Sequence, residues 1–400
     1  MLDTEIFGSL LGLDSGWQVS SVDFREAESS LLLVVERVGP TLCPVCGKVC
    51  PKHDHSEERS WRHLDTMQFT TLLACRVPRA DCQEDGVHQM NVPWAGPKSR
   101  FTSLFEALAI RVLQLTKSQV RTGRLLGLSA DQVHDIMHRA VDRGLARRTV
   151  GAVAHIGVDE KSFQRRDFGT VLCDLGNKRV LAVERGRKEE SAVKAFESLD
   201  EPEKVRTVCM DMSEAFRNAA LTHLAHADLI HDRFHVAMML SEAVDKTRRT
   251  EARTCADLKD SRYVWLKNPE NLTDKQRATF ERLVNTELKT AEAYALKQVF
   301  RSFFEQDDIQ AAAAFFTDWL AEVEKRNLTH MNKVAKTLAK NLQGLLNAVK
   351  WKLTNAYAES LNASIQEIKT VARGFRKFES FRIAVLFFLG KLDISPHKCR

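Results

Sequence analysis

Hydrophobic and polar positions change their spacing several times along the chain. Residues 18–24 alternate loosely between the two kinds, and residues 31–38 are rich in branched apolar side chains, which predicts two strands. A further strand-like run covers residues 69–75. Residues 101–148 then show helical spacing with few breakers. The chain is therefore expected to begin with a β-rich segment that is followed by helices.

The middle of the chain predicts strands and helices in a defined order. Three strands, a helix, a strand, a helix and a last strand follow one another, which is the order of the ribonuclease-H-like fold. Residues 236–350 are predicted to be almost uninterrupted helix, and basic helices follow. The predicted strands cover residues 155–163, 168–174, 179–183, 205–213 and 228–230, and the first helix covers residues 189–199.

Length and composition indicate a globular protein with several domains. Of the 400 residues, 44% are hydrophobic and 28% are charged, which excludes a disordered, collagen-like or coiled-coil protein. The length predicts two to four domains. The longest strongly apolar run, Ile383–Gly390, is too short to span a bilayer, and no signal-peptide pattern precedes it at the N-terminus. We therefore expect a cytoplasmic protein without a membrane partner.

Positive charge is concentrated near the C-terminus. The whole chain carries a formal net charge of +6, but residues 325–400 hold 15 Lys or Arg against 4 Asp or Glu, a local net charge of +11. This concentration favours a polyanionic partner, above all nucleic acid. A solvated helical face would show the same bias, so charge alone leaves both interpretations open.

Cysteines near the N-terminus predict a structural zinc site. The chain has nine cysteines, an odd number that favours free thiols and metal ligands over a disulfide framework. Cys43-Pro-Val-Cys46-Gly places two thiolates two residues apart, a spacing that suits tetrahedral Zn²⁺ in a small β domain. Cys75 and Cys82 are the predicted second pair, although six residues separate them. Substitutes for one ligand are Cys50, His53, His55, His63 and His88.

Residues 118–141 predict a helix-turn-helix. A short helix over 118–126 leads into a Gly-Leu-Ser turn, in which Ser129 is a good N-cap for a second helix. Early exposed positions of that helix, among them Gln132 and His134, would reach base edges in the major groove. Any helical hairpin could show this pattern. The predicted apolar face consists of Val133, Ile136, Met137, Ala140 and Val141.

Acidic residues stand at positions that suit a metal centre. Asp159 lies within the first strand of the predicted core and Asp211 at the carboxyl end of the fourth, positions that lie side by side in the ribonuclease-H-like fold. Carboxylates held so close repel each other unless they share a divalent cation. Glu359 is the expected third ligand, on a polar helical stripe that runs through Asn362 to Lys369 and Arg373. The opposing apolar stripe is predicted to consist of Tyr357, Leu361, Ile365, Ile368 and Ala372. The simpler interpretations are that Asp211 caps a helix and Glu359 is solvated.

Asp232 and His235 follow the fifth strand of the predicted core. They could orient the metal site from its second shell or contact DNA, and capping the next helix is the plainer alternative. Glu160, one residue after Asp159, points to the opposite strand face and is the less favoured ligand.

Taken together, the cysteine cluster, the helix-turn-helix and the acidic residues resemble the DDE transposases of bacterial insertion sequences, specifically the ISL-three family. The resemblance covers nearly the whole chain and keeps the family order, which is a zinc finger, a helix-turn-helix and a ribonuclease-H-like core split by a helical insertion. The wide spacing between Cys75 and Cys82 departs from the pattern. The strings that carry the resemblance are Ile156–Glu160, Asp211–Phe216, Asp232–Val236, Ala358–Asn362, Ala372–Phe375 and Trp61–Leu64.

The resemblance implies a multidomain α+β protein. Its ribonuclease-H-like α/β core would be interrupted by an all-helical insertion and preceded by the zinc-binding β module and the helix-turn-helix. The expected divisions are a zinc-finger module (1–95), a helix-turn-helix domain (100–150), the first part of the core (153–235), the insertion (236–350) and the second part of the core (351–400).

The same resemblance implies a catalytic triad of Asp159, Asp211 and Glu359 that holds two Mg²⁺ or Mn²⁺ ions for DNA cleavage and strand transfer. The N-terminal modules would read terminal inverted repeats in double-stranded DNA. Target DNA, into which the element is joined, would be a second DNA partner. At least a homodimer is expected on DNA, because two ends must be joined, and a bacterial, nucleoid-associated location follows. The residues expected to grip DNA phosphates are Lys369, Arg373, Arg376 and Lys377.

Two other functions fit part of the pattern. A ribonuclease-H-like nuclease or resolvase would cut branched DNA without transposing it. A non-catalytic regulator derived from a transposase would keep the DNA-binding modules alone, and the intact set of Asp159, Asp211 and Glu359 disfavours it.

Overall fold

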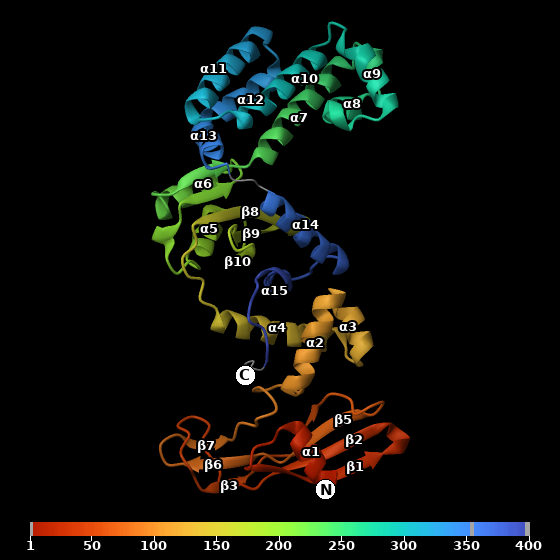
Figure 1. Cartoon of the computed structure of the whole chain (residues 1–400), viewed down its shortest axis with the longest axis vertical. Coiled ribbons are helices and arrows are strands. Elements are labelled where there is room, and N and C mark those ends of the chain that lie inside the picture. Colours follow the sequence, from red (N-terminus) through yellow and green to blue (C-terminus); the bar gives the residue numbers. More distant parts are fainter. Residues whose placement is uncertain (1–2, 353–355, 397–400) are drawn as a thin grey trace. The chain divides into compact units, whose positions relative to one another are not determined.

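The computed structural model of the chain describes residues 3–352 and 356–396, without the side chains of residues 356–359 (Figure 1). The chain divides into two compact units. The first runs up to Arg148 and also takes in the segment from Leu392 onward, and the second is Thr149–Lys391. No helix within the described ranges is long and apolar enough to cross a membrane.

The first unit begins with a helix and two small sheets. One sheet has the strand order β1-β2-β5-β4 and the other has the order β3-β6-β7. The strands predicted at residues 18–24, 31–38 and 69–75 are confirmed as β1, β2 and β5. The elements are α1 (Asp3–Leu11), β1 (Trp17–Arg25), β2 (Ser30–Arg37), β3 (Lys52–His55), β4 (Arg59–Arg62), β5 (Thr70–Cys75), β6 (Pro78–Cys82) and β7 (Gly86–Gln89).

Three tryptophans form the centre of this β-rich part. Trp94 meets Trp17 and Trp61 edge to face, with ring centroids 4.9 Å and 5.6 Å apart. Every second residue of β2 from Leu31 to Val35 is buried in the same core. A small domain buries little apolar surface, so these large rings supply much of its hydrophobic stabilisation.

Three helices follow in the first unit: α2 (Ser103–Thr116), α3 (Gln119–Leu126) and α4 (Ala130–Arg147). The predicted cap of α4 is confirmed, because Ser129 Oγ accepts from the Gln132 amide at 3.1 Å and Gln132 Oε1 accepts from the Ser129 amide at 2.9 Å. The predicted apolar face is confirmed as well. Its buried members are Val133, Ile136, Met137, Ala140 and Val141.

A buried carboxylate fastens α4 to α2. Glu106 is only 4% exposed, and it pairs with Arg139 at 2.5 Å and with Arg143 at 3.0 Å. Ser99 Oγ donates a further hydrogen bond to this carboxylate at 2.9 Å. A charge so deeply buried is tolerated only when it is paired and hydrogen-bonded, so the pairing holds the two helices in one arrangement.

The segment from Leu392 to Ser395 also packs on α4. Arg143 Nη1 donates to the carbonyl of Ile394 at 2.9 Å, and Arg147 pairs with Asp393 at 3.1 Å. The Ile394 side chain is buried. The helical part of the first unit is therefore assembled from two stretches of sequence that lie more than two hundred residues apart.

The turn between α3 and α4 depends on Gly123. A Cβ atom there would lie 2.4 Å from the Leu128 carbonyl oxygen, a backbone atom that cannot move aside cheaply. We expect Gly123→Ala to destabilise this motif by about 1–3 kcal/mol through overpacking. Hydrogen exchange of the α3 and α4 amides measures the change. Leu125→Ala is the control, because this side chain is 69% exposed, and equal protection in both variants would contradict the prediction.

The second unit is built on a five-stranded sheet in the order β10-β9-β8-β11-β12. β8 pairs antiparallel with β9 and parallel with β11, which in turn pairs parallel with β12. The predicted order of strands and helices is confirmed. The elements are β8 (His155–Gln164), β9 (Asp167–Asp174), β10 (Arg179–Arg185), α5 (Glu189–Phe196), β11 (Thr207–Met210), α6 (Glu214–His223) and β12 (Asp228–His231).

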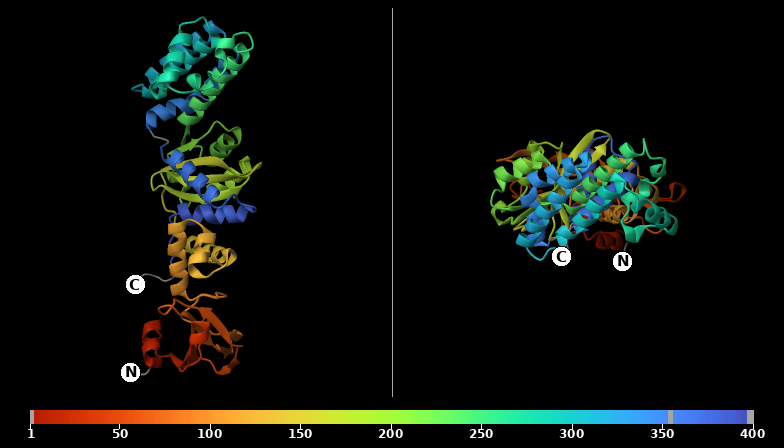
Figure 2. Two further views of the ribbon diagram at one scale, coloured as in Figure 1. Left: turned by 90° about the vertical axis from the view of Figure 1, so that its right-hand side faces the viewer. Right: turned by 90° about the horizontal axis from the view of Figure 1, so that it is seen from above.

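Helices cover both faces of this sheet (Figures 1 and 2). α5 and α6 pack on the face that presents Ile156 and Val158, and together they form a hydrophobic core. On the opposite face, α14 (Ala356–Val371) places Leu361 beside β8, and α15 (Phe378–Leu389) packs Phe381 on Phe163 with ring centroids 5.7 Å apart. The sheet therefore has two buried faces, and its edges and strand ends are left for function.

A helical segment lies between β12 and α14 in the sequence, as predicted for residues 236–350. Trp265 and Trp319 are buried in its core, where their indole N–H groups donate to Ser261 Oγ at 3.1 Å and to the Leu296 carbonyl at 3.0 Å. The helices are α7 (Arg233–Glu251), α8 (Arg262–Leu266), α9 (Asp274–Val284), α10 (Lys289–Phe300), α11 (Ile309–Arg326), α12 (Thr329–Lys340) and α13 (Leu342–Trp351).

Candidate functional site

Three carboxylates meet at one edge of the five-stranded sheet. Asp159 lies on β8, Asp211 directly follows β11 and Asp232 directly follows β12. β8, β11 and β12 are parallel, so the ends of β11 and β12 reach the same edge next to the middle of β8. All three residues line one cleft, which has a volume of about 450 Å³ including its open mouth. The other lining residues are Gly157, Val158, Lys161, Val171, Cys173, Leu175, Cys209, Met210, His235, Leu361, Asn362 and Ile365.

Alternation along β8 directs Asp159 into the cleft. The side chains of Ile156 and Val158 belong to the core beneath α5 and α6, and Val158 also borders the cleft. Asp159 and Lys161 lie on the other strand face and line the cleft without entering that core. Glu160 is not a lining residue, and its carboxylate lies 3.7 Å from Arg187. This placement agrees with the expectation that Glu160 points away from Asp159.

Two polar side chains approach the Asp159 carboxylate. The Lys161 ammonium lies 2.7 Å from Asp159 Oδ2, and the Asn362 amide donates to the same oxygen at 3.2 Å. Neither residue was predicted to be part of the site. Asn362 belongs to the predicted polar stripe of α14, and this was the signal that could have identified it.

The electrostatics of the cleft favour added positive charge. Burial raises the pKa of Asp211, and the negative charges of Asp159 and Asp232 raise it further. The Ser213 amide, which donates to Asp211 Oδ1 at 3.0 Å, opposes this shift. The ionised carboxylates therefore repel one another in a partly desolvated place, which is the arrangement that a divalent cation relieves.

Asp232 caps α7, which was the plainer of the interpretations, and it also lines the cleft together with His235. Asp232 Oδ1 caps α7 by accepting from the Phe234 amide at 2.7 Å, while its Oδ2 lies 3.0 Å from His235 Nδ1. The hydrogen bond to Asp232 is the main reason why the pKa of His235 is raised. Both side chains also line the cleft, so the cap and the position beside the other carboxylates are compatible.

Glu359 lies in α14, but its side chain is outside the described part of the structure. Its position in the helix is one turn before Asn362, and residues three apart share a helical face. Leu361, Ile365 and Ile368 are buried, which confirms these members of the predicted apolar stripe. α14 therefore runs along the cleft on the side of Asp159.

The four cations predicted to grip DNA lie at and beyond the end of α14. Lys369 is half-buried in the last turn of the helix, and Arg373, Arg376 and Lys377 are exposed between α14 and α15. They follow the cleft-lining part of α14 in sequence within the same unit.

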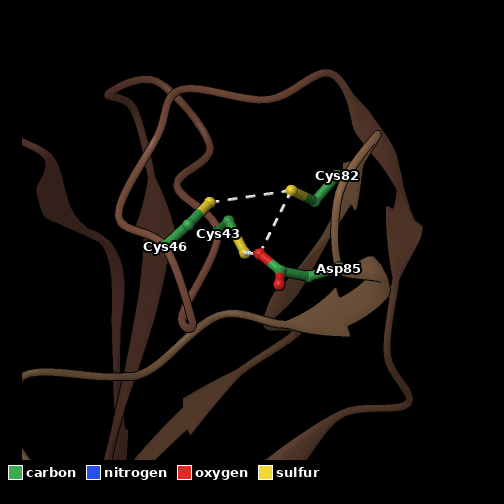
Figure 3. A group of neighbouring side chains, drawn as sticks. All are labelled: Cys43, Cys46, Cys82 and Asp85. Atoms are coloured by element: carbon green, nitrogen blue, oxygen red, sulfur yellow. Dashed lines mark hydrogen bonds between the residues drawn. The ribbon is translucent and has the colours of Figure 1, made fainter.

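A second cluster, in the first unit, could hold a metal ion. Ligand atoms of Cys43, Cys46, Cys82 and Asp85 all lie within 4.8 Å of one another (Figure 3). The Sγ atoms of Cys46 and Cys82 are 3.7 Å apart, and Asp85 Oδ2 lies 3.2 Å from Cys43 Sγ and 3.4 Å from Cys82 Sγ. Three thiols and a carboxylate form a four-ligand set of the kind that binds Zn²⁺.

The two halves of this cluster share one backbone pattern. Cys43-x-x-Cys46 is followed by Gly47, and Cys82-x-x-Asp85 is followed by Gly86. Both glycines have a positive φ, 75° and 81°, which closes the chain tightly behind the ligands. The repeat of spacing and glycine was the signal for Asp85 in the sequence.

Cys75 does not reach this cluster. It is 1% exposed at the end of β5 in the tryptophan-centred core, where burial raises the pKa of its thiol to about 12. The side chain of a strand residue faces one side of the sheet only, and that of Cys75 faces the core. None of the substitutes Cys50, His53, His55, His63 and His88 belongs to this four-ligand set. Cys50 lies beside it, because its thiol interacts with Cys82, and His88 bonds the Asp85 carbonyl at 2.6 Å. His63 bonds Thr102 Oγ1 at 2.9 Å instead.

The residues predicted to read bases both lie near the start of α4. The Gln132 side chain is part of the capping box, so part of its hydrogen-bonding capacity is already used. His134 Nδ1 lies 3.3 Å from Gln119 Nε2 of α3. Both side chains are half-buried.

Comparison with known proteins agrees with this architecture. Residues 156–385 match the transposase family, residues 39–85 match the zinc-finger of transposases IS204, IS1001, IS1096 and IS1165, and residues 90–141 match the helix-turn-helix domain of transposase family ISL3. The three matches follow the order of the modules described above. The sheet, its cleft and the preceding modules are thus those of a transposase. The chain belongs to the ISL3 family of transposases, as the sequence predicted.

Curated relatives align along nearly their whole length. The chain is 24% identical over 402 residues to the transposase for insertion sequence element IS1001 of Bordetella parapertussis, an alignment that covers 96% of this chain and 98% of that protein. It is also 24% identical over 442 residues to the transposase for insertion sequence element IS1557 of Mycobacterium tuberculosis, covering 100% of this chain and 97% of the relative. The zinc-finger match and the cysteine-rich cluster together support a structural zinc.

The raised pKa of Asp211 predicts how metal and stability are linked. Because folding raises this pKa, the ionised carboxylate disfavours the folded state, a contribution that is absent below the usual Asp pKa and complete above the raised value. We expect Asp211→Asn to raise the thermal midpoint of metal-free protein at pH 7 by about 1–4 °C. Mg²⁺ or Mn²⁺ should stabilise the wild type and leave the variant almost unchanged. Thermal scans with and without the metal measure both effects. If the metal raised the thermal midpoint of the variant as much as that of the wild type, Asp211 would not be a metal ligand.

Proposed function

We propose that the chain is a DNA transposase that binds the terminal inverted repeats of an insertion sequence and catalyses metal-dependent DNA cleavage and strand transfer. Asp159, Asp211 and Glu359 are its proposed catalytic carboxylates. The observation that carries the proposal is the meeting of Asp159 and Asp211 in one cleft beside α14, the helix that contains Glu359. Membership of the transposase family supplies the class of reaction.

The strand order supports a ribonuclease-H-like assignment for the core. β8, β9 and β10 form an antiparallel meander, and β11 and β12 extend the sheet parallel to β8. With this topology, side chains from β8 and from the ends of β11 and β12 meet without a long loop between them.

The cleft suits a divalent cation by its donor set. Its carboxylates are hard oxygen ligands, the repulsion among them is relieved by positive charge, and α14 brings a further carboxylate position one turn before Asn362. We propose two Mg²⁺ or Mn²⁺ ions, which when bound lower the pKa of an attacking water or 3′-hydroxyl and stabilise the leaving oxygen.

The surrounding residues have supporting roles in this proposal. Lys161 and Asn362 hold the Asp159 carboxylate in place through contacts of 2.7 Å and 3.2 Å. His235 is protonated more readily because of Asp232, and its charge would offset part of the negative charge of a DNA strand. Arg373, Arg376 and Lys377 are exposed cations that would contact phosphates without reading sequence.

DNA recognition falls to the first unit in this proposal. The helix-turn-helix match supports DNA binding, and the start of α4 would approach the major groove of the terminal repeat. Joining two element ends requires two sites, so we propose that the chain acts on DNA as a homodimer or a larger assembly.

A cleavage and strand-transfer assay tests the proposed function. The substrate is DNA that spans the native gene and both flanks, with Mg²⁺ or Mn²⁺ added. We expect nicks at fixed positions on both flanks, and a loss of at least about a thousandfold in Asp159→Asn and Glu359→Gln. Glu160→Gln is the matched control, because it changes the neighbouring carboxylate outside the cleft and should keep activity within a few-fold.

Other outcomes of this assay point to the two rival functions. Preferred cutting of four-way junctions over the element ends would indicate a nuclease or resolvase. Specific binding without cutting, by wild type and variants alike, would indicate a regulator and would overturn the catalytic assignment.

We further propose that Cys43, Cys46, Cys82 and Asp85 hold one structural Zn²⁺. Metal analysis of purified protein should find one zinc per chain, and Asp85→Ala should lose zinc to a chelator about ten to a hundred times more readily than wild type. Asp85→Cys should retain it, because thiolate is a strong zinc ligand. Cys75→Ala and Asp81→Asn are the controls. Loss of zinc in Cys75→Ala with retention in Asp85→Ala would contradict this set and would favour Cys75, the ligand predicted from the sequence.

A further inference from the structure

A pocket opens beside the start of α7, separate from the carboxylate cleft. It lies within the helical segment of the second unit, among α7, α10 and the short helix η5 (Arg301–Glu305), and has a volume of about 1070 Å³ including its open mouth. The residues that matter for its chemistry are Arg233, Phe234, Lys297, Arg301, Phe304 and Glu305.

Residues at the start of α7 line both the carboxylate cleft and the pocket. Asp232 and His235 line the carboxylate cleft, whereas Arg233 and Phe234, the two residues between them, line the pocket. Figure 1 shows α7 leading from the sheet into the helical segment. A helical turn advances only about 5.4 Å, so a strand held in the cleft has its neighbouring nucleotides within reach of the pocket.

The pocket carries positive charge that is only partly compensated. The Lys297 side chain is 5% exposed and donates to the Leu266 carbonyl at 2.9 Å. Burial lowers its pKa to about 8, and the charge of Arg301 contributes. Arg301 is itself paired with Glu270 at 2.8 Å. Within the described ranges, no carboxylate lies within ion-pair distance of Lys297 or Arg233, although Glu305 stands at the rim.

Aromatic side chains complete the lining. Phe234 is 54% exposed, so its ring is open to a ligand. The Arg233 guanidinium lies over the ring of Phe304, 5.0 Å from its centroid. An exposed ring next to a cation is the pair of features by which proteins bind single-stranded nucleic acid, since a base stacks on the ring and its phosphate meets the cation.

We propose that this pocket binds an unpaired nucleotide of the DNA strand that is processed in the cleft. The base would stack on Phe234, and Arg233 together with Lys297 would receive its phosphate. This inference rests on the proposed function for its DNA substrate. One nucleotide drawn out of the helix would fix the strand's register, so that the neighbouring scissile phosphate lies at the carboxylates.

Photo-crosslinking locates the nucleotide directly. Full-length protein is incubated without divalent metal with single-stranded oligonucleotides that carry 5-iodouracil at one position, irradiated and mapped by mass spectrometry. We expect a cross-link at Phe234 and about tenfold weaker oligonucleotide binding in Phe234→Ala. Met238→Ala is the matched control, because this side chain is 49% exposed on the same helix but outside the pocket, and it should bind as wild type does.

Two further measurements separate the contribution of the phosphate to binding from that of the base. Arg233→Gln should reduce the slope of log affinity against log salt by about one, as expected for the loss of one phosphate contact. Deoxynucleoside monophosphate should compete with the oligonucleotide better than inorganic phosphate does. Equal competition by the two would mean an anion site without a base and would overturn the proposal.

The pocket and the proposed catalysis can fail separately. Cross-links that map only outside the pocket, with equal affinity in Phe234→Ala and Met238→Ala, would overturn the pocket even if Asp159-dependent cleavage is observed. A Phe234-dependent cross-link in a protein that does not cut DNA would support the pocket and overturn the catalytic proposal alone.

Discussion

Parallel pairing of β8, β11 and β12 is the constraint on which the second unit depends. It places the middle of one strand and the carboxyl ends of two others at the same sheet edge. Asp159, Asp211 and Asp232 are thereby brought together although they are spread over more than seventy residues of sequence. The same pairing gives the sheet two apolar faces, which α5 and α6 cover on one side and α14 and α15 on the other.

Much of this arrangement was predictable because it follows local rules. The strand pattern around Asp159 and the N-cap at Ser129 are set by spacing and by residue type over a few positions. The contact of Lys161 with Asp159 follows a local rule as well, because residues two apart on a strand share a face. The contact of Asn362 with Asp159 was not predictable in this way. It depends on how α14 lies against the sheet, and sequence periodicity says which face of a helix is apolar but not which strand it meets.

In the cysteine-rich cluster, residue type was a poorer guide to the fourth position than the conformation of the backbone. Counting cysteines favoured Cys75, which the structure places in the core of the tryptophans. The turn that ends in Gly86 has the form of the turn that ends in Gly47, so the fourth position is set by backbone geometry and is filled by a carboxylate. A mixed set of this kind is expected to exchange its metal more readily than four thiolates would.

Packing of the segment from Leu392 on α4 has a consequence for biosynthesis. The helix-turn-helix is encoded before residue 150, but Ile394, which is buried against α4, is encoded after the entire second unit. During translation the first unit therefore lacks part of its packing until the second unit has been made. A chain cut short inside the helical segment would lack Ile394 and its contact with α4, so the helix-turn-helix would be expected to be less stable in that fragment than in the longer chain.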